Sequence, residues 1–264
     1  MSKQIFLINP ELTIESLAAN FTGKGVQVAV IDSGIDAAHP ALAGKIKRGC
    51  IVRLLEGDRI ECKEVTAEES YDSFGHGTAV AGIIADIAPD AEITSVKVLN
   101  EYNSCTANML LEGLKWALEQ KFPLINMSLA AREQFAQQLF RLCEQAYVQN
   151  SIIVTSRRNF GDLGCPAMFS SVISVDRGNF DNKYKYSFRP NNIIEYEARG
   201  TEVNVLAPKA GYACQTGSSF ATPHITGIVA LLLQAFPGML GVEAKAALRF
   251  MHTLDGQLSD RSLE

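Results

Sequence analysis

The sequence predicts an α/β fold with an open, mostly parallel central sheet that is covered by helices on both faces. Short runs of β-branched and apolar residues alternate along the chain with longer stretches of helical apolar spacing. Such alternation requires crossover connections between parallel strands. The 264 residues are 47% hydrophobic and 20% charged, which is enough apolar material for the core of a large domain. We therefore expect a single domain over residues 1–264.

The first half of the chain supplies two strands and two helices. Residues 26–31 are rich in valine and isoleucine and have Gln27 as their one polar member, which is typical of a buried strand. A helix is predicted at residues 76–85, where Val80, Ile83 and Ile84 recur at helical spacing. A strand at residues 93–99 and a helix at residues 106–120 follow. The polar, acidic residues 56–71 are expected to form a surface excursion.

The alternation of predicted strands and helices continues in the second half of the chain. Strands are predicted at residues 124–129, 151–155, 172–175 and 202–207, and helices at residues 133–149 and 219–235. Sites in open sheets of this kind gather at the carboxyl ends of the strands. Asp32 stands at such an end, directly after the first strand, and is the first candidate for a functional residue.

Charge and composition exclude several classes of partner. A net charge of -5 without runs of like charge argues against nucleic acid or an anionic membrane as the main partner. No apolar run approaches a membrane span, and residues 1–11 lack the apolar stretch of a signal peptide. The six cysteines show no metal-ligand spacing. We expect reduced thiols, a cytoplasmic location, and no metal or cofactor.

Three short motifs follow one another in the order acid, base and nucleophile. They are Asp32-Ser33-Gly34, His76-Gly77-Thr78 and Gly217-Ser218-Ser219-Phe220-Ala221-Thr222-Pro223. Ser219 is a weak nucleophile unless a base takes its proton, and His76, with an ordinary pKa near 6.5, can do so at neutral pH. Asp32 would hold the imidazole in one tautomer and stabilise its cation.

Each motif alone has a simpler explanation, since Asp-Ser-Gly after a strand is most often a turn. His76 is distinguished by the glycine that follows it and by the apolar helix that would anchor it. The other three histidines are expected to be structural. They are His39, His224 and His252.

The third motif, extended by His224, resembles the nucleophile signature of the subtilisin-like serine proteases. That signature is usually Gly-Thr-Ser-Met-Ala-Thr-Pro-His, so Ser218 and Phe220 are departures from it. The order of the three motifs is also that of this family. The resemblance covers roughly residues 23–248, and it implies a serine endopeptidase with Asp32, His76 and Ser219 as its triad.

The resemblance extends to the oxyanion hole and the substrate groove. Residues 153–159 align with the family stretch that ends in an oxyanion-hole asparagine, which implies that Asn159 donates beside the Ser219 backbone N–H; the alternative is an ordinary loop asparagine. Residues 125–130 resemble the strand that pairs with an extended peptide substrate. The implied substrate contacts are Ser128, Leu129 and Ala130 on one edge, and Asn103, Ser104 and Cys105 on the other.

The other wall of the pocket for the residue before the cut bond departs from the family. It is usually made of Ala and Gly, whereas this chain has Ser156, Arg157 and Arg158. If the alternation of the strand holds, Ser156 and Arg158 face the pocket and Arg157 faces away. This predicts a preference for an acidic residue before the cut. The alternative is that both arginines bend to solvent.

Two further departures concern metal and biological role. Residues 86–92 are too few for the loop with which many relatives bind a structural calcium, so we expect none there. The Asp32 motif comes early, without the long pro-region of exported relatives. A selective intracellular protease that matures leader or precursor peptides is therefore our preferred role. The alternatives are a broad degradative protease and a catalytically silent peptide-binding module; the sequence does not predict an oligomeric state.

Overall fold

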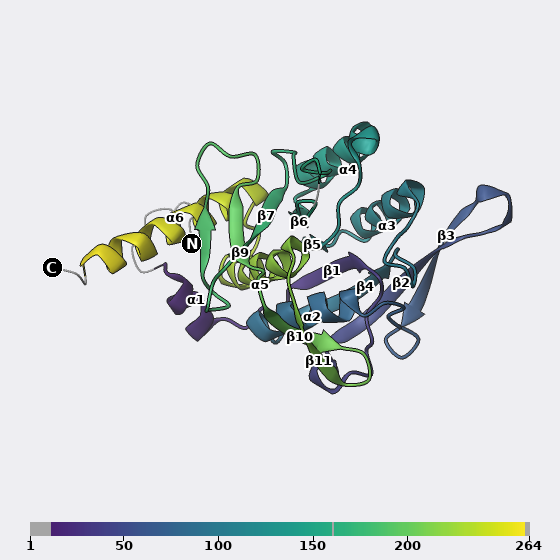
Figure 1. Cartoon of the computed structure of the whole chain (residues 1–264), viewed down its shortest axis with the longest axis horizontal. Helices are drawn as coiled ribbons and strands as arrows, with labels where there is room; N and C mark the ends of the chain where they lie inside the picture. The colour runs from purple at the N-terminus through teal and green to yellow at the C-terminus, as the bar shows by residue number, and fades with distance from the viewer. Residues whose placement is uncertain (1–11, 160, 262–264) are drawn as a thin grey trace.

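A nine-stranded sheet runs through the computed structural model, which describes residues 12–159 and 161–261 (Figure 1). Its order is β3-β2-β4-β1-β5-β6-β7-β9-β8, with every pair parallel except the two at the edges, β2–β3 and β8–β9. The strands are β1 (Gln27–Asp32), β2 (Ile46–Leu54), β3 (Ile60–Thr66), β4 (Glu92–Lys97), β5 (Leu124–Met127), β6 (Ile152–Ser156), β7 (Ile173–Gly178), β8 (Tyr186–Phe188) and β9 (Tyr196–Arg199). The predicted α/β class is confirmed.

Helices cover both faces of this sheet (Figure 1). The helices are α1 (Ile14–Asn20), α2 (His76–Ile87), α3 (Ala107–Glu119), α4 (Ala136–Gln149), α5 (Ser218–Ala235) and α6 (Gly241–Arg261). One apolar core lies between the sheet and α2 and α5, and a second lies between the sheet and α3 and α4. In β1, Val28 and Val30 enter the first core while Ala29 and Ile31 enter the second. Because successive side chains of a strand point to opposite faces, a strand covered on both sides must be apolar throughout.

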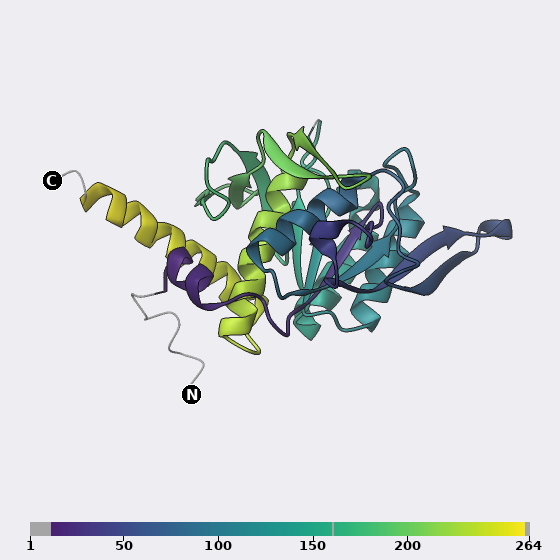
Figure 2. The ribbon, with the colours of Figure 1, turned by 90° about the horizontal axis from the view of Figure 1, so that it is seen from below.

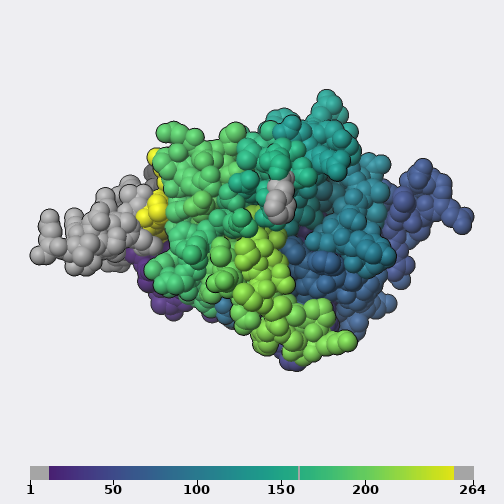
Figure 3. Space-filling view, viewed as in Figure 1, coloured from purple at the N-terminus to yellow at the C-terminus, as the bar shows by residue number. Residues whose placement is uncertain are grey.

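The excursion predicted at residues 56–71 lies mostly at the surface, but part of it is a regular strand. Residues 60–66 form β3, which pairs with β2 in an antiparallel hairpin. The hairpin extends from the body as an arm (Figures 1, 2 and 3). Its Val65 is buried, but most of the strand is half-buried or exposed, so charged residues are tolerated at this edge. Edge strands with charged side chains are common because they resist pairing with other chains, and the apolar signal is weak there.

The strand predicted at residues 202–207 forms, but it does not join the central sheet. It is β10 (Val203–Ala207), and it pairs with β11 (Gly211–Gln215) in a separate antiparallel ribbon. The ribbon packs on α2, where Leu206 fills the space above Gly82. Helices α1 and α6 and strands β2, β8, β9 and β11 were not predicted. Within the described residues, no helix has the length and apolarity that a membrane crossing would require.

The central strands and two helices position the functional residues. β4, β1, β5 and β6 are parallel neighbours, so their carboxyl ends lie at one edge of the sheet. β1 ends at Asp32, and α2 and α5 begin at His76 and Ser218. Parallel strands and returning helices therefore bring three distant segments to the same edge.

Candidate active site

Asp32 and His76 form the best-defined contact of the site. Asp32 is fully buried, and its Oδ1 lies 2.8 Å from Nδ1 of His76. The helix start can approach so closely because of two glycines. Gly75 has φ 103°, a conformation that other residues rarely adopt, and a Cβ on Gly77 would lie 2.1 Å from the Gly34 carbonyl oxygen.

The charge of Asp32 controls the state of His76. Burial of the imidazole disfavours its charged form, but the carboxylate beside it outweighs burial and raises the pKa of His76. Asp32 Oδ1 also accepts the Ser33 backbone N–H at 2.7 Å, whereas Oδ2 is buried without a partner among the described residues. Because Nδ1 contacts the carboxylate, Nε2 is the nitrogen left to accept a proton.

A second aspartate, Asp72, ties the loop after β1 to the start of α2. Its Oδ1 accepts from Ser33 Oγ and Gly75 N, both at 2.7 Å, and its Oδ2 accepts from Thr78 N at 2.8 Å and Thr78 Oγ1 at 2.7 Å. Burial opposes ionisation, but these hydrogen bonds lower the pKa of Asp72. The sequence analysis did not foresee this role of Asp72. An aspartate just ahead of a helix is a capping signal that could have found it.

Ser219 and Asn159 meet at the start of α5. Asn159 Oδ1 accepts from Ser218 N at 3.1 Å and from Ser218 Oγ at 3.0 Å. The position that a Cβ on Gly217 would occupy lies 3.2 Å from Ser219 Oγ and 3.6 Å from Asn159 Nδ2. The amide donor and the serine oxygen therefore flank one point at a helix N-terminus, where negative charge is favoured. Ser218 was part of a predicted motif, but its role in holding Asn159 was not foreseen.

His76 and Ser219, the predicted base and nucleophile, are not joined by a hydrogen bond in the described part of the chain. Within the described part of the chain, Ser219 Oγ makes no hydrogen bond, although His76 and Ser219 line the same cavity. The His76 ring also packs against that of Phe220, with centroids 5.3 Å apart. Such hydrogen bonds are often long without substrate and tighten when substrate binds.

The remaining histidines have structural settings, as predicted. His39 Nδ1 accepts from the Ala41 backbone N–H at 3.2 Å, and the His252 ring packs near that of Tyr186. His224 Nδ1 lies 2.8 Å from the Phe220 carbonyl oxygen. Burial lowers the pKa of His224 to about 4, so this imidazole is neutral at physiological pH.

A cavity of about 760 Å³ runs from Ser219 along the surface. It is lined by His76, Ser219 and Asn159, and by each of the substrate-contact residues predicted from the sequence. These are Asn103, Ser104, Cys105, Ser128, Leu129, Ala130, Ser156 and Arg158. Leu110 and Phe135 also line it and were not predicted.

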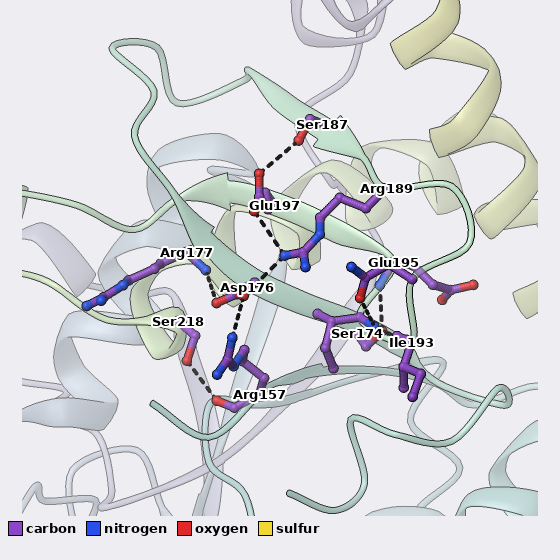
Figure 4. Close-up of polar contacts among 12 residues, drawn as sticks. Arg157, Ser174, Asp176, Arg177, Ser187, Arg189, Ile193, Glu195, Glu197 and Ser218 are labelled. Carbon is purple, nitrogen blue, oxygen red and sulfur yellow. Dashed lines mark hydrogen bonds and ion pairs between the residues drawn. The ribbon is translucent and has the colours of Figure 1, made fainter. Parts of the chain in front are cut away.

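The two arginines beside Asn159 both line the cavity but have different partners. The stem of Arg158 packs beside Gly164, where an added Cβ would lie 2.5 Å from Arg158 Cγ and 2.9 Å from the Cβ of Ala130. Its Nη1 pairs with Asp162 Oδ1 at 2.9 Å. The guanidinium of Arg157 turns instead toward β7, as Figure 4 shows.

Metal-binding groups do not gather in this part of the molecule. Across residues 12–159 and 161–252, whose side chains the structure describes, no three His, Cys, Asp or Glu side chains are placed to hold a metal ion. The six cysteines are free thiols. The chain passes from the end of α2 at Ile87 to the start of β4 at Glu92 in four residues.

Comparison with known proteins agrees with this geometry. Residues 23–262 match the model of the subtilase family. The intracellular serine protease of Paenibacillus polymyxa is 35% identical over 228 residues, covering 80% of this chain and 68% of its own. Subtilisin DY of Bacillus licheniformis is 32% identical over 239 residues, covering 83% and 81%. The crystal structure of a cold-adapted subtilisin-like serine proteinase aligns with a TM-score of 0.70 and 25% identity, covering 87% of this chain and 83% of that one.

Proposed function

Because this chain belongs to the subtilase family of serine endopeptidases, we propose that Asp32, His76 and Ser219 are its catalytic triad and that Asn159 completes its oxyanion hole. The observation that carries the proposal is the 2.8 Å contact between Asp32 Oδ1 and His76 Nδ1, at the end of a cavity that also holds Ser219. The acid, base and nucleophile of one peptide hydrolysis reaction would thus act from β1, α2 and α5.

The reaction uses these groups in two steps. Ser219 Oγ attacks the peptide carbonyl carbon while His76 Nε2 takes the hydroxyl proton, and Asp32 stabilises the imidazolium. The oxyanion accepts hydrogen bonds from Asn159 Nδ2 and the Ser219 backbone N–H. When the intermediate collapses, the C–N bond breaks, the amine leaves with the proton from His76, and an acyl-enzyme remains. Water then hydrolyses the ester by the same route.

The substrate we propose is a peptide bound as an extended strand. Ser128, Leu129 and Ala130 would contact one side of it, and residues 103–105 the other. Main-chain hydrogen bonds supply sequence-independent affinity in this mode, and pockets for side chains supply selectivity.

We propose that the pocket for the substrate residue before the cut bond prefers an acidic side chain. The carboxylate of that side chain would bind to Arg158, which lies beside Ser156. Its present partner Asp162 is about one-third exposed, as Arg158 is, and exposed ion pairs contribute only about 0–1 kcal/mol. A substrate carboxylate in the cavity can therefore compete with Asp162. A charge-assisted hydrogen bond of about 1.5–3 kcal/mol corresponds to roughly tenfold selectivity or more.

Matched peptides that differ only in Glu, Leu or Lys before the cut bond test this assignment. The Glu peptide is expected to have a kcat/KM roughly tenfold or more above the others. Arg158→Ala should remove the advantage. Arg132→Ala, which removes the same charge from the rim of the same cavity, should retain it. Equal cleavage of the three peptides would indicate a broad degradative protease, and cleavage of none would indicate a silent peptide-binding module.

For the biological role we propose selective processing of leader or precursor peptides inside the cell. An arginine in the pocket wall favours narrow over broad selectivity. The relative from Paenibacillus polymyxa, which is an intracellular serine protease by name, supports a cytoplasmic location.

The pH profile should report the proton that His76 must accept. The base works only when neutral, so activity is present above its pKa and is lost as pH falls through that value. Because Asp32 raises the pKa of His76, we expect the midpoint of kcat/KM to lie above the ordinary value of about 6.5. Peptide hydrolysis from about pH 5 to about pH 9 measures it, with melting temperatures as the control for unfolding. A midpoint at or below about 6.5 contradicts the expectation.

A further inference from the structure

We propose that Asp176, on β7, is a positioning residue that acts through Arg157 to hold Asn159 in its place in the oxyanion hole. The inference rests on the proposed function, because it takes Asn159 as the oxyanion donor. Asp176 does not line the cavity, so it acts on another residue of this chain rather than on substrate.

Asp176 is the centre of a charged cluster that includes Arg157, Arg189 and Glu197 (Figure 4). Its Oδ2 accepts from Nη1 of Arg157 at 3.0 Å and from Nη1 of Arg189 at 3.2 Å. Its Oδ1 accepts the backbone N–H of Arg177 at 2.8 Å. The residue is only 9% exposed, so these hydrogen bonds are weakly screened and hold the carboxylate in one orientation.

Arg157 transmits that orientation to the main chain. β6 ends at Ser156, and Arg157 N still donates to the Val175 carbonyl of β7 at 3.1 Å. Beyond this point the Arg157 side chain holds the segment, because its Nε donates to the Arg158 carbonyl at 3.0 Å while Nη1 reaches Asp176. One planar guanidinium therefore connects the Asp176 carboxylate to the peptide bond that immediately precedes Asn159.

Ser218 holds the same segment from the other side. Its Oγ lies 2.8 Å from the Arg157 carbonyl oxygen and 3.0 Å from Asn159 Oδ1. The main chain before Asn159 and the amide of Asn159 are thus held between β7 and the start of α5. If the Asp176 charge is lost, the guanidinium is released and the peptide bond before Asn159 gains freedom. A displacement of about 1 Å in such a group can cost up to about 100-fold in rate.

The far side of the cluster offers a matched control. Arg189 Nη1 also pairs with Glu197 Oε1 at 2.9 Å, and Glu197 Oε2 accepts from Ser187 Oγ at 3.3 Å. Glu197→Gln therefore removes the same charge from the same cluster, one ion pair further from Asn159. A general loss of cluster stability would affect both variants, whereas loss of the Arg157 connection affects only Asp176→Asn.

The experiment compares Asp176→Asn and Glu197→Gln in the wild-type and Asn159→Ala backgrounds, by kcat and KM for one peptide and by melting temperature. We expect Asp176→Asn to lower kcat about 10- to 100-fold with little change in KM. We expect Glu197→Gln to leave kcat near that of the wild type. In the Asn159→Ala background, Asp176→Asn should have almost no further effect, because the group it positions is gone. Arg157→Lys keeps the charge but has no nitrogen at the Nε position, so it loses the planar fork that spans the Arg158 carbonyl and the Asp176 carboxylate. It should therefore reproduce the loss even if Asp176→Asn does not fold.

Three outcomes overturn the inference. The first is an unchanged kcat in Asp176→Asn or Arg157→Lys, and the second is an equal loss of kcat in Glu197→Gln. The third is that Asp176→Asn lowers kcat by the same factor in the wild-type and Asn159→Ala backgrounds. Failure of the proposed function gives a different result. In that case the wild-type chain hydrolyses no peptide, or Asn159→Ala alone is as active as wild type.

Discussion

Replacement of Ser219 by alanine is expected to abolish peptide hydrolysis, with a loss of kcat on the order of 10⁶; this magnitude comes from a related subtilisin. Without the hydroxyl there is no acyl-enzyme, and the oxyanion hole alone gives only residual catalysis. A fluorophosphonate forms a covalent bond to an activated serine. Labelling followed by mass spectrometry of the intact protein therefore measures the loss of the nucleophile. The wild-type chain should gain one label and Ser219→Ala none.

The neighbouring serine provides the control for this experiment. Ser218→Ala removes a hydroxyl that holds Asn159 and Arg157 but leaves the nucleophile, so this variant should still be labelled, more slowly than wild type. Labelling of Ser219→Ala at the wild-type rate would place the nucleophile elsewhere. A wild-type chain that takes no label would support the silent peptide-binding module.

Asp32→Asn should give the second largest effect, a loss of kcat of about 10⁴. The amide keeps the size of the carboxylate but no longer favours the tautomer that leaves Nε2 of His76 free to accept a proton. It also removes the charge that raises the pKa of His76. The pKa of His76 should therefore fall, because burial then acts without the opposing carboxylate. Steady-state kinetics measures the first effect, and NMR titration of the His76 ring measures the second.

Asp36→Asn is the matched control for this change. It lies four residues further along the chain and, within the described part of the chain, makes no contact with His76; its carboxylate accepts only from the Ala38 backbone N–H, at 3.1 Å. It should retain wild-type kinetics. A loss of less than tenfold in Asp32→Asn, or a pKa of His76 that rises, contradicts the role of Asp32.

Elements with a dense apolar pattern were predictable because burial on both faces leaves a local signal. β1 was predicted at residues 26–31 and observed at Gln27–Asp32, and α2 was predicted to begin at His76, where it does begin. The edge strand β3 was not recognised, because a strand that is exposed at a sheet edge carries charged residues and loses that signal. The strand β10 was predicted but placed in the wrong sheet, because a strand pattern does not specify which sheet the strand joins.

The sequence by itself determined the residue types of the proposed chemistry and their order, from Asp32 through His76 to Ser219. The resemblance to the subtilisin-like proteases also identified part of the lining of the cavity. Only the tertiary structure decided how these groups are held. Asp72 bonds to the Ser33 hydroxyl 39 residues away, and Ser218 bonds to the Arg157 carbonyl 61 residues away. A polar side chain finds its partner through the packing of distant segments, and neither periodicity nor a short motif records that partner.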